Sequence, residues 1–194
     1  MITSLSQLDP NGSYTYADYL NWKFEEYIEL IKGKIFPMAA PSRVHQKVSS
    51  NLHYELRRFY VHSPCDVYAA PFDVRLKRID KATNQEITTV VQPDICVICD
   101  ESKLDDRGCL GAPDLVIEIL SPGNTKKEMR QKYEVYQESG VKEYWLVNIT
   151  DKTILCYRLN SEGIFIGLQP LTDDDFLTTP LFQGMNIEVA KVFE

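Results

Sequence analysis

The feature that most constrains the fold is an apolar run, PDLVIEIL (113–120), together with the two segments C-terminal to it. A helix is expected to begin at Asn124 or Thr125 and to end near Gly140, a natural C-terminal stop. A second apolar run then spans Lys142–Ile149. A strand, a helix and a strand in succession indicate a mixed α/β protein.

The other patterns extend this order in both directions. At 194 residues the length fits one domain, which we expect to span residues 1–194. We expect a central mixed sheet flanked by helices, with an N-terminal hairpin extension. The expected elements are a short helix Tyr14–Trp22 capped by Ser13, a hairpin turning at Lys32-Gly33, a long amphipathic helix from Ser42 to about His62, strands Val67–Leu76 and Thr88–Cys99, and a hairpin of Thr153–Leu159 and Gly163–Leu168.

The composition indicates a cytoplasmic protein. No apolar run approaches the roughly 18 residues of a membrane-spanning helix, and the N-terminus lacks a basic region followed by an apolar stretch. The five cysteines are odd in number, so we expect reduced thiols. Cys96 and Cys99 have CxxC spacing, but on a strand they would face opposite sides and would not share a metal.

Charge is distributed unevenly along the chain. The 21 Lys and Arg against 28 Asp and Glu give a net charge of −7, which argues against broad nucleic-acid binding. Residues 43–81 hold eight basic and four acidic side chains, a local +4, so the remainder carries −11. This segment forms either a local basic face or a set of solvated charges on a helix and a loop.

Two carboxylates stand in otherwise apolar strands. Alternation places Glu118 on the face opposite Ile117 and Ile119, and a buried carboxylate needs a cation, a metal or several donors. Asp94 follows Pro93 at the head of another apolar strand, and adjacent antiparallel strands would bring Asp94 and Glu118 together. Such a pair could hold Mg²⁺ or Mn²⁺. Alternatively, each carboxylate bonds loop backbone.

Pro93-Asp94 on one strand, with an acid on the next, resembles the PD-(D/E)XK nuclease superfamily, which includes many restriction endonucleases. Further strings are distinctive: YIELIKGKI (27–35), His45, QPDICVI (92–98), PDLVIEILSPGNT (113–125), Lys132-Tyr133 and GVKEYWLVN (140–148). On these strings the chain resembles more closely the restriction endonuclease family often called Uma-two, a domain of unknown function, from about residue 14 to about residue 170. The resemblance implies a restriction-endonuclease-like fold.

The lysine of the superfamily pattern is displaced. In (D/E)XK it stands two residues after the acid, and that position is Leu120 here. In relatives with this gap the next helix often supplies the lysine, which makes Lys132 the candidate. Lys132 has helical spacing to Met129 and Tyr136 on the stripe expected to be buried, so its stem can follow that stripe to the carboxylates. Alternatively, Lys132 pairs with Glu128 on a solvated surface.

Four further residues are weaker candidates. Glu29 matches the glutamate of the family's opening motif, which implies a further metal ligand or a residue that holds a metal-bound water. His45, near the start of the long helix, has either a supporting catalytic role or a structural hydrogen bond. Asp73 and Asp114 are spare carboxylates that could substitute in the site.

The resemblance implies Mg²⁺- or Mn²⁺-dependent cleavage of DNA. Asp94, Glu118 and Glu29 would hold the metal, the Ile119 carbonyl would complete its coordination, and Lys132 would orient the attacking water. Restriction-type enzymes that cut both strands are often dimers, so a homodimer is also expected. Two alternatives stay open: a catalytically inactive module for nucleic-acid binding or homo-oligomeric assembly, and metal-dependent hydrolysis of a smaller phosphate substrate.

Overall fold

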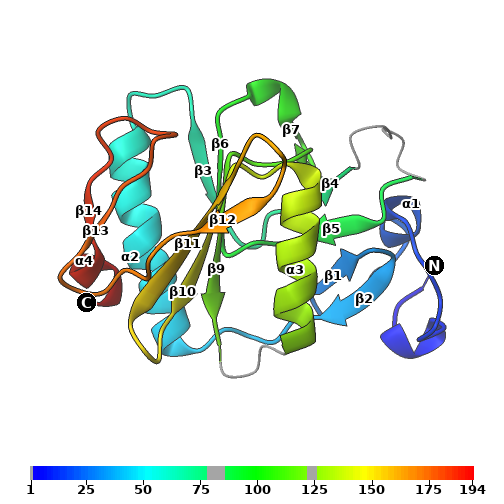
Figure 1. The fold of residues 1–194 in the computed structure, drawn as a ribbon. Helices are drawn as coiled ribbons and strands as arrows, with labels where there is room; N and C mark the ends of the chain where they lie inside the picture. Colours follow the sequence, from blue (N-terminus) through cyan, green and yellow to red (C-terminus); the bar gives the residue numbers. More distant parts are fainter. Residues whose placement is uncertain (1, 78–85, 122–125) are drawn as a thin grey trace.

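The structure, a computed structural model, describes residues 2–77, 86–121 and 126–194. These residues form two six-stranded mixed sheets, a two-stranded sheet and helices (Figure 1), which confirms the mixed α/β class. The first sheet has the order β2 (Lys34–Pro37), β1 (Ile28–Ile31), β5 (Thr89–Val91), β4 (Val74–Leu76), β8 (Gly108–Leu110), β7 (Leu104–Asp105). The second has the order β12 (Phe165–Gly167), β11 (Thr153–Leu159), β10 (Glu143–Asn148), β9 (Leu115–Leu120), β6 (Ile95–Ile98), β3 (Asp66–Ala69).

There are two large sheets, where one central sheet was expected, because two of the expected strands are interrupted. The run Val67–Leu76 forms β3 and β4, and the run Thr88–Cys99 forms β5 and β6, so each run contributes to both sheets. Pro71 and Pro93 lie in the two interruptions. Proline has no backbone N–H and cannot continue a ladder of hydrogen bonds. The second break places Asp94 immediately before β6.

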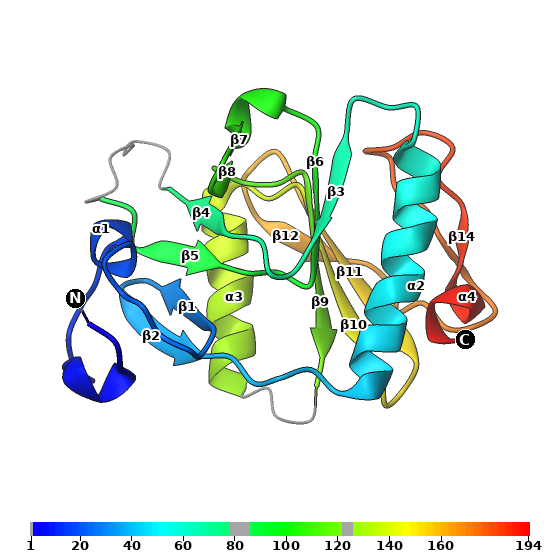
Figure 2. The same ribbon diagram turned by 180° about the vertical axis from the view of Figure 1, so that it is seen from behind.

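Helices α2 (Arg43–Tyr60) and α3 (Lys126–Ser139) cover opposite faces of the second sheet (Figures 1 and 2). Alternation along β9 divides its side chains between two cores: Ile117 packs in the cluster that contains Leu52 of α2, and Val116 in the cluster that contains Tyr136 of α3. Glu118 is therefore on the α3 face. No helix within the described ranges is long and apolar enough to cross a membrane.

Local signals explain where these elements begin and end. The hairpin of β1 and β2 turns at Lys32-Gly33 as predicted, with positive φ at both residues, as a type I′ turn requires. Ser42 caps α2, also as predicted. The first helix, α1 (Tyr16–Tyr19), is shorter than expected, and its cap is Thr15 rather than Ser13, because Thr15 forms a capping box with Asp18.

The remaining elements lie near the ends of the second sheet. The predicted start of α3 at Asn124 or Thr125 falls outside the described residues, and its predicted end is confirmed at Ser139, before Gly140 with φ +83°. The β11–β12 hairpin is also confirmed. The other described elements are β13 (Phe176–Leu177), β14 (Ile187–Glu188), α4 (Val189–Phe193) and two 3₁₀ turns (Leu5–Gln7 and Glu101–Lys103).

The expectation of five reduced cysteines is wrong for two of them. Cys65 and Cys99 form a disulfide, whereas Cys96, Cys109 and Cys156 are free and buried. The pairing follows from the register of β3 and β6, which places Asp66 opposite Ile98 and hence Cys65 opposite Cys99. Cys96 packs in the core on the α3 face and Cys99 against the core on the α2 face, so these two do lie on opposite sides of the sheet.

Candidate active site

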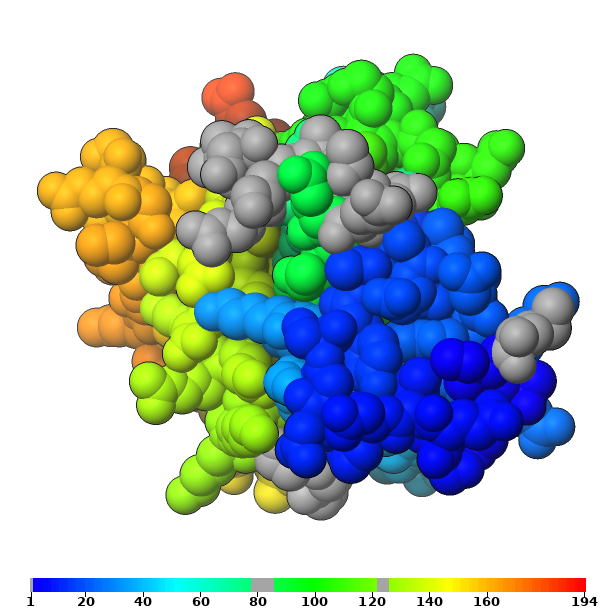
Figure 3. Space-filling model, turned by 90° about the vertical axis from the view of Figure 1, so that its right-hand side faces the viewer, coloured from blue at the N-terminus to red at the C-terminus, as the bar shows by residue number. Residues whose placement is uncertain are grey.

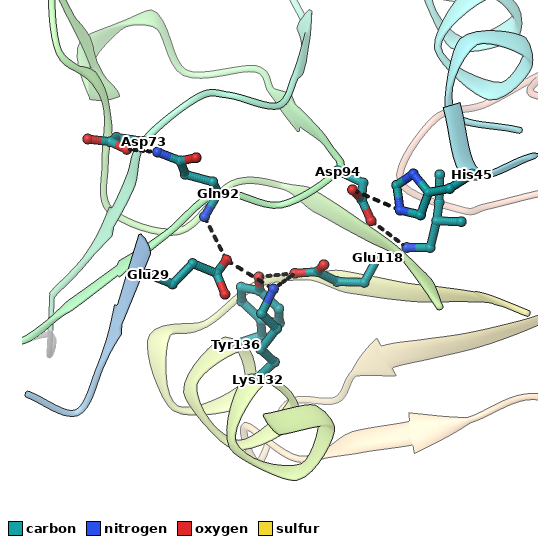
Figure 4. Close-up of polar contacts among 9 residues, drawn as sticks. Glu29, His45, Asp73, Gln92, Asp94, Glu118, Lys132 and Tyr136 are labelled. Carbon is teal, nitrogen blue, oxygen red and sulfur yellow. Dashed lines mark hydrogen bonds and ion pairs between the residues drawn. The ribbon is translucent and has the colours of Figure 1, made fainter. Parts of the chain in front are cut away.

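Five side chains from five parts of the chain lie in two neighbouring polar networks that meet at the backbone of Glu118 and Ile119 (Figure 4). They are the five expected to form the site: Glu29 from β1, His45 from the first turn of α2, Asp94 before β6, Glu118 from β9 and Lys132 from α3. One network runs from Glu29 through Lys132 to Glu118, and the other runs from the Ile119 backbone through Asp94 to His45.

Asp94 and Glu118 stand at opposite positions of two antiparallel strands. The register pairs Ile95 of β6 with Ile117 of β9, so the next position along sets Asp94 opposite Glu118. Side chains at opposite positions of antiparallel strands have Cβ atoms about 4.5–5.5 Å apart. The Ile119 N–H donates a 2.7 Å hydrogen bond to Asp94 Oδ2, which fixes that carboxylate against β9. The two strands that carry these acids are thus adjacent and antiparallel.

Lys132 lies between two glutamates and is almost fully buried. Its Nζ is 2.9 Å from Glu29 Oε1 and 3.0 Å from Glu118 Oε1, and its side chain is 9% exposed. The alternative of a solvated pair with Glu128 does not describe this buried position. Burial alone would lower the pKa of the Lys132 amine, but the charges of the two glutamates outweigh burial and raise it above its usual value.

Glu118 is buried, and among the described residues its side chain accepts hydrogen bonds from two donors, both on α3. Burial raises the pKa of the Glu118 carboxyl to about 7, and Asp94 and Glu29 add to the rise, while Lys132 and Tyr136 oppose it. The Tyr136 hydroxyl donates a 2.6 Å hydrogen bond to the same oxygen, Oε1, that contacts Lys132. Glu118 is therefore an acid whose charge depends on its partners near neutral pH.

Glu29 is held by the Gln92 backbone and by Lys132 rather than by Asp94 or Glu118. Its side chain is 2% exposed, and its Oε1 accepts hydrogen bonds from the Gln92 backbone N–H at 2.9 Å and from Lys132. The hairpin that carries Glu29 packs against α3, where Lys32 pairs with Glu134 and Glu138. Figure 3 shows the blue N-terminal residues in contact with the yellow-green atoms of α3.

His45 contacts Asp94 from the opposite side. Its Nε2 is 3.2 Å from Asp94 Oδ1, and only 6% of the residue is exposed. Burial alone would lower the pKa of the imidazole, but the Asp94 carboxylate and the Ile119 backbone outweigh it and raise the pKa. Together, the Ile119 N–H and His45 hold both oxygens of Asp94.

The two spare carboxylates lie away from the Asp94–Glu118 pair. Asp73 accepts hydrogen bonds from Gln92 Nε2 at 2.8 Å and from the Tyr19 hydroxyl at 3.3 Å, and burial raises its pKa. Asp114 stands before β9, at the end of the strand remote from Glu118, where it accepts from the Cys99 N–H and pairs with Lys142. Neither residue substitutes for Asp94 or Glu118.

The basic segment 43–81 does not form one surface in its described part. Arg57 pairs with Asp66, and Arg58 pairs with Glu55 near the C-terminal end of α2. Arg75 is buried, pairs with Asp105 and lies over the Tyr16 ring. The segment is thus divided between the two ends of a helix and the interior, and residues 78–81 lie outside the described ranges.

Sequence reasoning missed the functional placement of Tyr136 and Gln92. Tyr136 was recognised only as part of the buried stripe of α3, although a buried tyrosine usually finds a partner for its hydroxyl. That rule, together with the spacing of four residues between Lys132 and Tyr136, was the available signal that the two side chains lie side by side. Gln92 had no such signal, because its partners Glu29 and Asp73 are 63 and 19 residues away.

A divalent ion fits the Asp94–Glu118 pair better than it fits all three carboxylates. Within residues 2–77, 86–121 and 126–194, no group of three or more His, Cys, Asp or Glu side chains is arranged to hold a metal. The Lys132 ammonium lies between Glu29 and Glu118, so the expected three-carboxylate set is not assembled. Mg²⁺ commonly binds through one or two carboxylates and keeps several waters, which a pair of opposed acids can provide.

A small pocket reaches Glu118 and Lys132. It lies between the first turns of α3 and the ends of β9 and β10, and Lys132 and Glu118 form part of its wall. The other lining residues are Ile119, Leu120, Glu128, Met129, Tyr144 and Leu146. Leu120, which occupies the position of the superfamily lysine, contributes an apolar wall beside the Lys132 ammonium.

Known proteins resemble this chain along most of its length. The family model Uma2, described as "Putative restriction endonuclease", matches residues 16–190. Two proteins of Synechocystis sp., described as uncharacterized, are 24% identical over 160 residues (81% of this chain, 80% of theirs) and 26% identical over 184 residues (92% and 93%). A crystal structure from Anabaena variabilis, described as "a putative nuclease belonging to DUF820", has a TM-score of 0.71 at 19% identity and covers 93% of this chain and 97% of its own. At that identity the likeness establishes the fold.

Proposed function

We propose a function from the family to which the chain belongs, the Uma2 family of restriction-endonuclease-like proteins. In this proposal the protein is a divalent-metal-dependent nuclease that hydrolyses phosphodiester bonds in DNA. One observation carries the proposal: a buried lysine from α3 contacts Glu118, whose partner across the sheet is Asp94. This is the set of groups that the PD-(D/E)XK pattern requires, with the lysine supplied by a helix instead of the strand.

Asp94 and Glu118 are the residues that would hold Mg²⁺ or Mn²⁺, with the Ile119 carbonyl as a further oxygen ligand. When bound there, the ion would supply positive charge to the scissile phosphate. The two acids need different support for this task. The Ile119 N–H and His45 orient Asp94, and Lys132 and Tyr136 hold Glu118.

Lys132 would act as a fixed cation. Its raised pKa keeps the amine protonated at neutral pH, so it can donate hydrogen bonds and stabilise negative charge on the phosphate oxygens, but it cannot accept a proton. Its contacts with Glu29 and Glu118 set the position of the ammonium before substrate binds. In this account Glu29 positions Lys132 and is not a metal ligand, and His45 positions Asp94.

The test is cleavage of supercoiled plasmid DNA with Mg²⁺ or Mn²⁺. Cleavage should be lost in Asp94→Asn, Glu118→Gln and Lys132→Met. Glu138→Gln is the matched control, because Glu138 is an exposed partner of Lys32 on the same helix as Lys132 and should leave the rate unchanged. Cleavage that survives all three site substitutions would refute the assignment.

A second candidate function is a nuclease-fold module without catalytic activity. Two observations favour this function. Lys132 and Tyr136 already donate hydrogen bonds to Glu118, and the net charge of the protein is −7. Calorimetric titration with Mn²⁺ separates the two functions, because a module with a dead site should bind no metal. Hydrolysis of a smaller phosphate ester would instead appear as activity on a model monoester or diester with none on plasmid.

Three broader expectations belong to the same proposal. Residues 1–194 would fold as one domain, the protein would work in the cytoplasm, and two copies would form a homodimer that cuts both strands. Light scattering coupled to size exclusion measures the oligomeric state directly, and a monomer would indicate cleavage of one strand at a time.

A further inference from the structure

We infer that Tyr136 is a positioning residue for Glu118. The Tyr136 hydroxyl fixes the metal-binding carboxylate of Glu118 in an enzyme whose lysine comes from a helix. The inference rests on the proposed function. The Tyr136 hydroxyl and the Lys132 ammonium both contact Glu118 Oε1, at 2.6 Å and 3.0 Å. The two donors lie four residues apart on α3 and therefore project from the same face of the helix.

Lys132 alone would not fix the carboxylate. Its amine is shared between Glu118 and Glu29 at nearly equal distances, 3.0 and 2.9 Å, and it ends a flexible four-carbon stem. A lysine two residues along the same strand would be held beside the acid by the strand itself, but Leu120 occupies that position here. Moving the lysine to α3 thus removes a geometric constraint from Glu118.

Tyr136 restores that constraint. Its residue is fully buried, its ring packs 5.0 Å from the Tyr144 ring, and its side chain has only two rotatable angles. Its hydroxyl has one acceptor among the described contacts, Glu118, so it does not divide its bond as Lys132 does. Two donors on Oε1 leave the other oxygen of Glu118 turned away from α3, on the side of Asp94 (Figure 4).

The neighbouring Tyr133 provides a matched control on the same helix. Its hydroxyl donates a 3.4 Å hydrogen bond to the Phe165 carbonyl of β12, and its ring also packs against Tyr144. Removing one hydroxyl oxygen from either tyrosine is the same chemical change in the same aromatic cluster. Only the Tyr136 hydroxyl touches a proposed metal ligand.

The experiment is calorimetric titration of Mn²⁺ into wild type, Tyr136→Phe and Tyr133→Phe at one pH, with thermal unfolding of each protein. Loss of an interaction that orients a metal ligand typically weakens metal affinity about 10–100-fold. We expect Tyr136→Phe to stay folded and to lose Mn²⁺ affinity in that range, and Tyr133→Phe to bind as wild type does. In plasmid cleavage, saturating Mn²⁺ should recover part of the Tyr136→Phe rate, and thermal unfolding without metal shows whether the variant is folded at the assay temperature.

Three results overturn the inference. Equal Mn²⁺ affinity in wild type and Tyr136→Phe would show that the hydroxyl does not position Glu118, and the proposed nuclease function would stand. An equal loss of affinity in Tyr133→Phe would assign the effect to the aromatic cluster as a whole. Absence of Mn²⁺ binding in the wild type itself would refute the proposed function, and the inference with it.

Discussion

The Lys132 ammonium lies 3.0 Å from an oxygen of Glu118, although the two residues are 14 positions apart and on different elements. The burial of Lys132 between two acids makes the charge of the amine and the charges of the acids depend on each other. The acids keep the amine charged, and the amine offsets the cost of burying the acids. Stability and chemistry at this site therefore depend on the same contacts.

Lys132→Met should destabilise the fold strongly and in a pH-dependent way. The substitution leaves Glu29 and Glu118 buried without their cation, and removing one partner of a buried ion pair costs about 3–5 kcal/mol. The loss should shrink as pH falls towards about 7, because removal of Lys132 raises the pKa of Glu118 above its wild-type value and the carboxyl of the variant then takes up a proton first. Urea unfolding at about pH 6 and about pH 8 measures both effects.

Lys32→Met is the control for that substitution. Lys32 also pairs with two glutamates, Glu134 and Glu138, but at the surface, where its side chain is 41% exposed. Exposed pairs contribute about 0–1 kcal/mol, so this variant should unfold within that range of wild type at both pH values. Equal losses in the two lysine variants would contradict the account of a buried ion cluster.

Metal affinity should rise with pH around neutrality. Burial raises the pKa of Glu118 to about 7, and a divalent ion competes with the proton for that carboxylate. Below about pH 7 each unit should weaken Mn²⁺ binding about tenfold, with a plateau above that range. Affinity that stays constant as the pH falls below neutrality would show that Glu118 does not ligate the ion.

His45 should stabilise the protein most at acidic pH. The pKa of its imidazole is raised in the folded protein by Asp94, so the protonated form is favoured on folding. That contribution is fully present below the unfolded pKa of about 6.5 and is lost as the pH rises through the higher folded pKa. The free energy lost in His45→Gln should be larger at about pH 5.5 than at about pH 8.5, and a larger loss at the alkaline pH would contradict the pairing.

Glu143 should prove structural, in contrast to Glu118 on the adjacent strand. It is 1% exposed and accepts hydrogen bonds from Arg158, Thr179 and Trp145, which together hold the segment before β14. Glu143→Ala should cost more than about 1–3 kcal/mol, the usual cost of one buried donor left without an acceptor, because the Trp145 N–H and the Thr179 hydroxyl both lose theirs. Its Mn²⁺ affinity should match wild type at a temperature where it is folded, and a selective loss of metal binding would contradict this division of roles.

Local sequence patterns predicted the elements that carry the site. The positive-φ turn at Lys32-Gly33, the Ser42 cap and the alternation around Glu118 are each determined by neighbouring residues, and each is confirmed. The position of Lys132 beside Glu118 was also accessible, since helical spacing and the resemblance together directed the lysine towards the carboxylates. These features depend on periods and caps that extend over only a few residues.

Long-range pairing is what the sequence could not reveal. The division into two sheets depends on which partners β4 and β6 find after the breaks at Pro71 and Pro93. The Cys65–Cys99 disulfide follows from a register that no local pattern encodes. For the same reason Glu29 was expected to join Asp94 and Glu118, whereas the Lys132 ammonium lies between Glu29 and Glu118.

The most direct measurement is a crystal structure of the wild type grown with Mn²⁺, with anomalous scattering used to locate the ion. The account predicts one manganese bonded to oxygens of both Asp94 and Glu118, with the Lys132 ammonium still on the opposite oxygen of Glu118. Manganese bonded elsewhere, or none between these two carboxylates in crystals that contain the ion at saturating concentration, would contradict it.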